Sequence, residues 1–78
     1  MDSCTLYYRP TCPYCLNVLR FIKGSGITIP LKDITEPENH AYLLRNGKVD
    51  QVPCLFVNEV PIYESEVIIA FLEKRSSE

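Results

Sequence analysis

The 78-residue sequence has neither an excess of positive charge nor a long apolar run, and these two absences exclude several classes of function. Its formal net charge is −2 at pH 7, which offers no electrostatic basis for binding nucleic acid or an anionic membrane. The longest apolar run, residues 67–72, is much shorter than the roughly 20 residues that span a bilayer. The first residues also lack the basic segment and apolar stretch of a signal peptide. We therefore expect a cytoplasmic protein that binds neither nucleic acid nor membranes.

Sets of metal ligands are also missing. Structural zinc sites use four ligands, whereas this chain has one C-x-x-C pair, Cys12 and Cys15, and one histidine, His40, which we expect to be solvated. Four cysteines in a short chain could instead form the disulfide framework of a secreted domain. Cys4 and Cys54, however, lie in apolar, strand-like segments and are expected in the core. We therefore expect no metal site and no such framework.

The feature that is present is a pair of thiols three residues apart, at the expected start of a helix. Pro13 suits the first helical position, because its missing N–H costs nothing there. Cys12 then falls at the cap, where free amides and the positive end of the helix dipole favour a thiolate. Cys15 lies about one turn further on, close enough to form a disulfide with Cys12. We interpret the two as a redox pair in which Cys12 attacks.

Apolar periodicity and turn residues predict seven elements in the order βαβαββα. Strands are expected at residues 4–8, 27–33, 54–57 and 60–63. Helices are expected from Pro13 to Gly24 or Gly26, from a capping box of Thr35 and Glu38 to Gly47, and from residues 64–66 onward. The last helix should bury Val67, Ile68, Phe71 and Leu72.

Two prolines predict how the strands are ordered. Pro30 and Pro61 cannot donate to a β-ladder, so the second and fourth strands should lie at the edges of the sheet. The third and fourth strands should form a hairpin around residues 58–59. An α/β fold follows, with a four-stranded mixed sheet in the order 2-1-3-4, flanked by three helices in a single domain over residues 1–78.

The chain resembles the glutaredoxins over essentially its whole length. The resemblance is carried by Cys12-Pro13-Tyr14-Cys15 after a first strand, by Val52-Pro53 before the third, and by the helix that opens after residues 60–63. Cys-Pro-Tyr-Cys is the characteristic active site of dithiol glutaredoxins. The resemblance implies a thioredoxin-like fold and glutathione-dependent thiol–disulfide exchange.

The chain departs from the glutaredoxin pattern in two places. Gln51 stands where glutaredoxins usually have threonine, and residues 63–67 replace their usual Gly-Gly-Cys-Asp-Asp stretch. The pair Glu64-Ser65 looks like the glutathione-binding element in the N-terminal domain of glutathione transferases. The glutathione site is therefore expected to be a transferase-like variant on a glutaredoxin body.

The resemblance implies an enzyme, a glutathione-disulfide oxidoreductase of the thiol transferase type. Cys12 would take glutathione from a glutathionylated protein, and a second glutathione would regenerate the Cys12 thiolate. Cys15 would resolve the mixed disulfide by closing a bridge to Cys12, as protein disulfide substrates require. The expected partners are glutathione and disulfide-containing or glutathionylated proteins. The protein itself is expected to be a monomer. Glutathione would be the reductant, with no tightly bound cofactor.

The residues expected to contact glutathione come from three segments. Arg9, where similar glutaredoxins carry lysine, could favour the thiolate and pair with a glutathione carboxylate, or be an ordinary loop charge. A cis Val52–Pro53 bond, implied by the resemblance, would turn the Val52 backbone toward the cysteinyl part of the substrate. Ser65 and the first amides of its helix would bind the γ-glutamyl carboxylate, or Ser65 could merely cap the helix. The full set is Arg9, Tyr14, Gln51, Val52, Pro53, Glu64, Ser65 and Glu66.

Three alternatives stay open on the sequence alone. An iron–sulfur cluster could be shared between two chains, with glutathione as an extra ligand. The chain could also bind glutathione without turnover. Within the same fold, it could be a dithiol donor that a flavoprotein reductase reduces. Cys54, next to Pro53, is either a core residue or has a redox side role.

Overall fold

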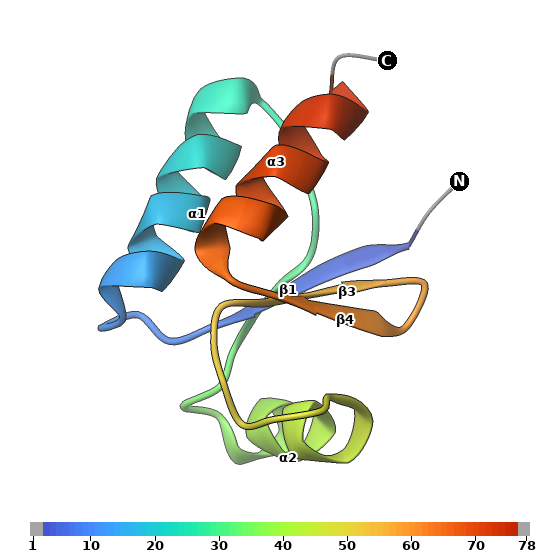
Figure 1. Ribbon diagram of the computed structural model, residues 1–78. Coiled ribbons are helices and arrows are strands. Elements are labelled where there is room, and N and C mark those ends of the chain that lie inside the picture. The colour runs from blue at the N-terminus through green and yellow to red at the C-terminus, as the bar shows by residue number, and fades with distance from the viewer. Residues whose placement is uncertain (1–2, 77–78) are drawn as a thin grey trace.

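The computed structural model describes residues 3–76 and contains the seven elements in the predicted order (Figure 1). They are β1 (Cys4–Tyr8), α1 (Pro13–Ser25), β2 (Leu31–Asp33), α2 (Pro37–Asn46), β3 (Cys54–Val57), β4 (Val60–Tyr63) and α3 (Ser65–Ser76).

The strands form one four-stranded sheet in the order β2-β1-β3-β4, which confirms the predicted topology and the thioredoxin-like fold. β1 pairs with β2 in parallel and with β3 antiparallel, and β3 and β4 form an antiparallel hairpin. Pro61 lies in the edge strand β4, as its missing N–H requires.

The second strand is shorter than predicted. It spans only Leu31–Asp33, because Pro30 has no N–H with which to continue the ladder upstream. The Pro30 carbonyl still accepts a hydrogen bond from the Leu6 amide at 3.0 Å. Ile27 and Ile29 pack against the core without joining the sheet, so their alternating pattern resembled that of a strand.

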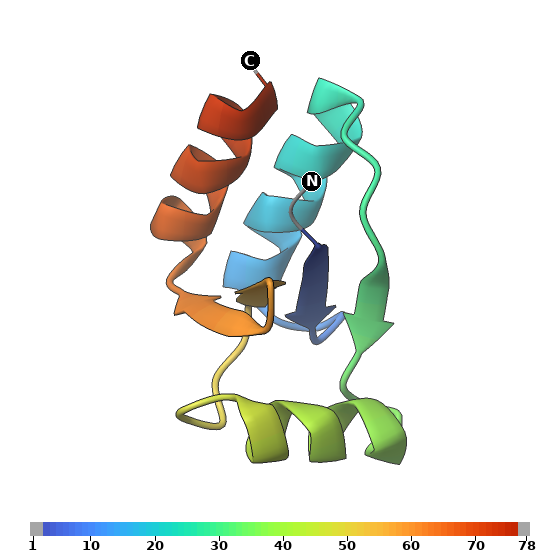
Figure 2. The same ribbon diagram turned by 90° about the vertical axis from the view of Figure 1, so that its right-hand side faces the viewer.

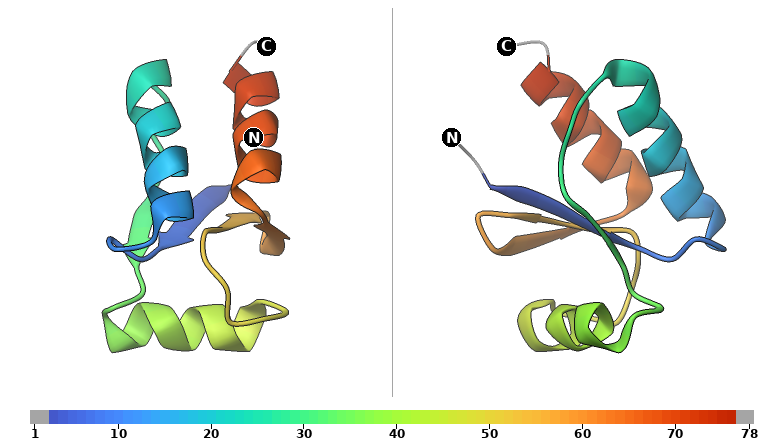
Figure 3. Two further views of the ribbon diagram at one scale, coloured as in Figure 1. Left: turned by 60° about the vertical axis from the view of Figure 1, so that its left-hand side comes forward. Right: turned by 180° about the vertical axis from the view of Figure 1, so that it is seen from behind.

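The sheet is covered on both faces. α1 and α3 lie side by side on one face, and α2 crosses the other (Figures 2 and 3). Successive strand residues point to opposite faces, so β1 sends Leu6 toward α1 and α3, and Tyr7 toward α2. Both faces of the central strands are therefore apolar, and β3 reads as a continuous apolar run.

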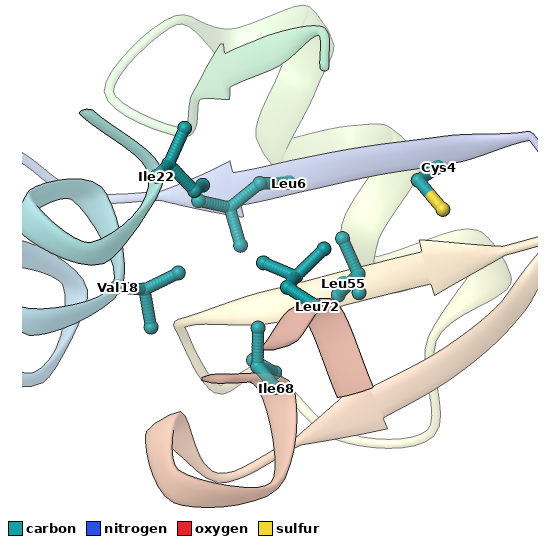
Figure 4. Packing of buried hydrophobic residues seen from close by; sticks show 7 residues of the cluster. All are labelled: Cys4, Leu6, Val18, Ile22, Leu55, Ile68 and Leu72. Atoms are coloured by element: carbon teal, nitrogen blue, oxygen red, sulfur yellow. The ribbon is translucent and has the colours of Figure 1, made fainter. Parts of the chain in front are cut away.

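The larger core lies between the sheet and the α1–α3 pair (Figure 4). Burying a side chain such as Leu6 or Leu72 completely stabilises the fold by about 1.5–3 kcal/mol. The buried members of this cluster are Cys4, Leu6, Val18, Ile22, Leu55, Ile68 and Leu72.

The smaller core lies under α2 and is aromatic. Tyr7 stacks on Tyr42 with ring centroids 5.2 Å apart, and Phe56 meets both rings edge-on. Leu43 and Ile34 complete the contact between α2 and the sheet. Such ring pairs add about 0.5–1.5 kcal/mol beyond the area that they bury.

Three local predictions are wrong. Thr35 does not cap α2: its N–H and hydroxyl both donate to Asp33 Oδ1 at 2.8 Å, in a turn that leaves Glu36 as the N-cap. Val67 is 52% exposed and so lies outside the core face of α3. His40 is not simply solvated, because its Nε2 lies 3.0 Å from Asp50 Oδ1.

Removing a buried side chain of α3 should cost far more stability than removing an exposed one. We expect Leu72→Ala to lower the free energy of unfolding by about 2–5 kcal/mol, since Leu72 is fully buried between α3 and the sheet. Val67→Ala, on the exposed side of the same helix, should change it by no more than about 0.5 kcal/mol. Urea unfolding followed by circular dichroism measures both. Equal losses would contradict this packing of α3.

Candidate active site

Cys12 and Cys15 lie at the start of α1, where the chain turns out of β1. Cys12 is the N-cap residue and Pro13 follows it in the first turn. The Cys12 carbonyl accepts the Leu16 amide at 3.0 Å, and its own amide donates to the Arg9 carbonyl at 3.1 Å. These two bonds fix the turn that presents Cys12 at the helix end.

The surroundings of Cys12 favour its thiolate. Partial burial disfavours the charge, but the amide and thiol of Cys15, the amide of Tyr14 and the positive charge of Arg9 outweigh it. Together they lower the pKa of Cys12 below its ordinary value. The sulfur closes no capping hydrogen bond of standard geometry, so its stabilisation comes from several weak contacts.

Cys15 has the opposite character. It is completely buried, and this burial raises its pKa to about 12. The Arg9 amide donates to Cys15 Sγ at 3.5 Å and lowers the pKa, while contact with Cys12 raises it. At neutral pH, Cys15 is therefore a protonated thiol beside a readily ionised one. One turn of helix thus separates a partly exposed thiol with a lowered pKa from a buried thiol with a raised one.

The segment before β3, residues 52–53, lies next to Cys12. The Val52–Pro53 bond is cis, as the resemblance implied. The Val52 carbonyl oxygen lies 4.0 Å from Cys12 Sγ, and the Pro53 side chain is fully buried behind it. A substrate bound at Cys12 would therefore meet the Val52 backbone.

A third segment joins β4 to α3. Glu64 has φ +75°, in the left-handed region that side chains rarely adopt, and its carbonyl accepts the Ile68 amide at 3.0 Å. Ser65, only 8% exposed, is the first residue of α3. This turn leaves the first amides of α3 at a helix N-terminus, which suits an anion.

The three segments enclose one cavity of about 310 Å³. Arg9 does not line this cavity, and its effect on the site is electrostatic. The remaining seven predicted residues do line it: Tyr14, Gln51, Val52, Pro53, Glu64, Ser65 and Glu66. The cavity thus offers carboxylates, helix amides and a free backbone edge within one small space.

A second cavity, of about 450 Å³, lies on the α2 side of the sheet, toward the β3–β4 turn. None of the predicted site residues lines it. Its lining residues are Ser3, Thr5, Tyr7, Tyr42, Phe56, Asn58 and Glu59.

Cys54 behaves as a core residue. It is fully buried, and burial raises the pKa of its thiol to about 11, although hydrogen bonds from Tyr63 and the Ile62 amide lower it. The thiol is therefore protonated at neutral pH and closed to solvent.

Sequence reasoning missed Tyr63. The hydroxyl of this residue bonds the backbone of Lys48 and Val49, in the loop that leads to Val52-Pro53. A tyrosine at the end of a strand, next to Glu64-Ser65, was the available signal. Its partners lie about 15 residues away in sequence and could not be read from spacing.

Two further searches concern metals and membranes. Within residues 3–76, no three histidine, cysteine or acidic side chains come together as metal ligands would. None of the helices described in that range has the length and apolar character that crossing a bilayer demands.

Comparisons with known proteins concern the family and the fold. The family model described as Glutaredoxin matches residues 4–62, a range that ends just before Tyr63-Glu64-Ser65. A comparison with curated proteins finds no match.

Solved structures of two kinds share the fold. Glutaredoxin 1 from Francisella tularensis, complexed with cacodylate, is 19% identical with a TM-score of 0.66, and each chain covers 100% of the other. The holo form of glutaredoxin C1 from Populus tremula x tremuloides is 14% identical with a TM-score of 0.69, covering 94% of this chain and 76% of that one. An epsilon-class glutathione S-transferase from the housefly, Musca domestica, is 22% identical with a TM-score of 0.76, covering 97% and 36%. The chain thus spans about a third of the transferase's length.

The inequality of the thiols predicts selective alkylation. In the native protein at pH 7, iodoacetamide should modify Cys12 before Cys15 or Cys54, because the thiolate reacts and only Cys12 combines a lowered pKa with exposure. Since the pKa is lowered, the rate should stay high below pH 9.0, the ordinary value, and fall only as pH drops through the lowered one. Mass spectrometry of digested protein measures each site.

Cys12→Ser is the control for this labelling. It should remove the fast phase and leave the slow labelling of the other thiols. Labelling of Cys15 in the native protein at the rate of Cys12 would contradict the assigned inequality.

Proposed function

The chain belongs to the glutaredoxin family, and we propose that it is a glutathione-dependent thiol–disulfide oxidoreductase. The observation that carries the proposal is the pairing of an accessible Cys12, with lowered pKa, and a cavity lined by the residues expected to bind glutathione. The fold shared with glutaredoxins and glutathione transferases supports it.

The first half of the proposed reaction loads glutathione onto the enzyme. The Cys12 thiolate attacks the glutathione sulfur of a glutathionylated protein, so that a Cys12–glutathione disulfide forms and the protein thiolate leaves. The leaving thiolate takes a proton from water. The Val52 backbone, 4.0 Å from Cys12 Sγ at its carbonyl, would pair with the cysteinyl part of glutathione.

The second half restores the thiolate. A second glutathione thiolate attacks the glutathione sulfur on Cys12, releasing oxidised glutathione and the Cys12 thiolate. With protein disulfides, Cys15 instead loses its proton and attacks Cys12, closing the Cys12–Cys15 disulfide and releasing the bound thiol. Two glutathiones then reduce this disulfide, which restores both thiols and releases oxidised glutathione. Because burial holds the pKa of Cys15 above its ordinary value, this branch needs a base to take the Cys15 proton, and glutathione competes with it.

The far end of the cavity would hold the γ-glutamyl group. Ser65 and the first amides of α3 would bind its carboxylate, and Glu64 or Glu66 would bind its ammonium group. Tyr14 would pack against the tripeptide from the α1 side. We propose that the natural partners are glutathione and glutathionylated or disulfide-containing proteins.

Variants of the two cysteines test the assigned roles. Cys12→Ser should abolish glutathione-coupled reduction of a small mixed disulfide, because no nucleophile remains. Cys15→Ser should retain that activity and lose the reduction of protein disulfides. Oxidation of NADPH in the presence of glutathione reductase measures the turnover.

Two outcomes would reject the proposal. An active Cys12→Ser with an inactive Cys15→Ser would reverse the roles, and wild-type protein without glutathione-coupled turnover would favour a binding module.

Anaerobically purified protein should also be colourless. Visible absorption bands would instead support an iron–sulfur carrier.

Ser65→Ala tests the far end of the cavity separately from the thiols. We expect KM for glutathione to rise about tenfold, which corresponds to the loss of roughly 1.4 kcal/mol from one charge-assisted hydrogen bond. The labelling rate of Cys12 should stay at its wild-type value, since Ser65 does not act on that sulfur. Thr28→Ala, an exposed hydroxyl lost far from the cavity, is the matched control. An unchanged KM in Ser65→Ala would remove Ser65 from the proposed glutathione contacts.

A further inference from the structure

The Tyr63 hydroxyl joins two segments that are far apart in the sequence. Tyr63 is the last residue of β4, and its ring packs in the aromatic core under α2. The hydroxyl accepts the amides of Lys48 and Val49 at 2.8 and 3.1 Å and donates to the Val49 carbonyl at 3.0 Å. One side chain thus binds the backbone of the loop between α2 and β3 at three points.

The hydroxyl accepts two of these bonds and donates the third, and it also lies close enough to the Cys54 thiol to lower the pKa of that thiol. The loop residues belong to no helix or strand, and Lys48, Val49 and Asp50 are exposed. The loop's own short-range contact is a bond from the Gln51 amide to the Val49 carbonyl at 3.0 Å. Together with the contact between His40 and Asp50 at 3.0 Å, the hydroxyl supplies ordering that secondary structure would otherwise provide.

Gly47 is an independent sign that space is reserved for this hydroxyl. A Cβ atom at position 47 would lie 2.6 Å from Tyr63 Oη and 2.7 Å from the Leu43 carbonyl oxygen, both closer than real Cβ contacts. Its φ of −87° is one that any residue adopts. Glycine is therefore required here by space and not by backbone conformation.

The two joined segments lead into two walls of the cavity beside Cys12. The loop bound by Tyr63 runs directly into Gln51, Val52 and Pro53, and Tyr63 itself is followed by Glu64 and Ser65. The β-ladder adds a second tie, because Tyr63 pairs with Cys54, the residue after Pro53.

We propose that Tyr63 is a positioning residue that sets the separation between the Val52 wall and the Ser65 wall of this cavity. The proposal rests on the proposed function, since the walls are those assigned to the cysteinyl and γ-glutamyl parts of glutathione. Tyr63 lines neither wall and contacts no reacting atom, so it acts through the loop. Losing the hydroxyl should therefore weaken glutathione binding and leave the thiol chemistry unchanged.

Tyr63→Phe is the direct test, because it keeps the ring in the aromatic core and removes only the hydroxyl. We expect KM for glutathione to rise about five- to tenfold, with kcat and the alkylation pH profile of Cys12 unchanged. Amide hydrogen exchange at Lys48 and Val49, followed by NMR, should become faster. Tyr42→Phe is the matched control, since it removes a hydroxyl from another ring of the same core, on α2.

Gly47→Ala is a second perturbation of the same contact, because its methyl group would press on the Tyr63 hydroxyl as well as on the Leu43 carbonyl at the end of α2. It should raise KM in the same direction and speed exchange at the same two amides. Circular dichroism before each assay checks that the variants are folded.

The outcomes separate this proposal from the proposed function. If the wild-type protein turns over with glutathione and Tyr63→Phe has the KM of Tyr42→Phe, the positioning role is wrong. A fall in kcat with a changed Cys12 profile would also overturn it, because Tyr63 would then act on the thiols. Wild-type protein without glutathione-dependent turnover would overturn the proposed function itself, whatever the exchange rates show.

Discussion

The site depends on the different solvation of two sulfur atoms one helical turn apart. Cys12 is at the helix cap, where amides and a nearby guanidinium favour its anion, whereas Cys15 is sealed inside the core and stays protonated. The rest of the fold maintains this difference. Val18 and Ile22 fix α1 against the sheet so that the buried side of its first turn is Cys15 and the open end is Cys12. A rotation of α1 that exposed Cys15 would also expose these apolar side chains, which makes it costly.

Strand directions explain why the cavity lies where it does. β1 ends, β3 begins and β4 ends at the same end of the sheet, because β3 runs antiparallel to both of its neighbours. The segment before α1, the cis Val52–Pro53 segment and the turn into α3 therefore meet there, although they are separated by about 40 and 10 residues in sequence. α1 and α3 both begin at this end of the sheet, so two helix N-termini meet at one cavity. Such a position suits both a thiolate and a carboxylate of the ligand.

Much of this arrangement could be predicted from the sequence, since it rests on local chemistry. Pro61 lies in one edge strand and Pro30 directly before the other, so their missing donors predicted the sheet order, and the C-x-x-C spacing with Pro13 predicted the helix start. Predictions failed where a local pattern had two outcomes. Thr35 could cap the helix or bond Asp33, and the second contact is the one formed. The contact of Tyr63 with residues 48–49 arises only from tertiary packing, so no spacing rule could reveal it.

The comparisons show that the fold alone does not select the chemistry. A glutaredoxin and a glutathione transferase share this fold at about 20% identity, so the reaction has to be argued from the site and not from the fold. In this chain the residues of the two proposed roles are on separate segments: Cys12 and Cys15 lie at the start of α1, while Glu64 and Ser65 lie at the start of α3, beyond the range that the Glutaredoxin family model matches. On the proposed function, substitutions at the start of α3 would change how glutathione is held without changing the solvation of the thiols. The residue between these functions is Tyr63, whose hydroxyl couples the α3 turn to the cis-proline loop, and it is through this coupling that a change at one wall would reach the other.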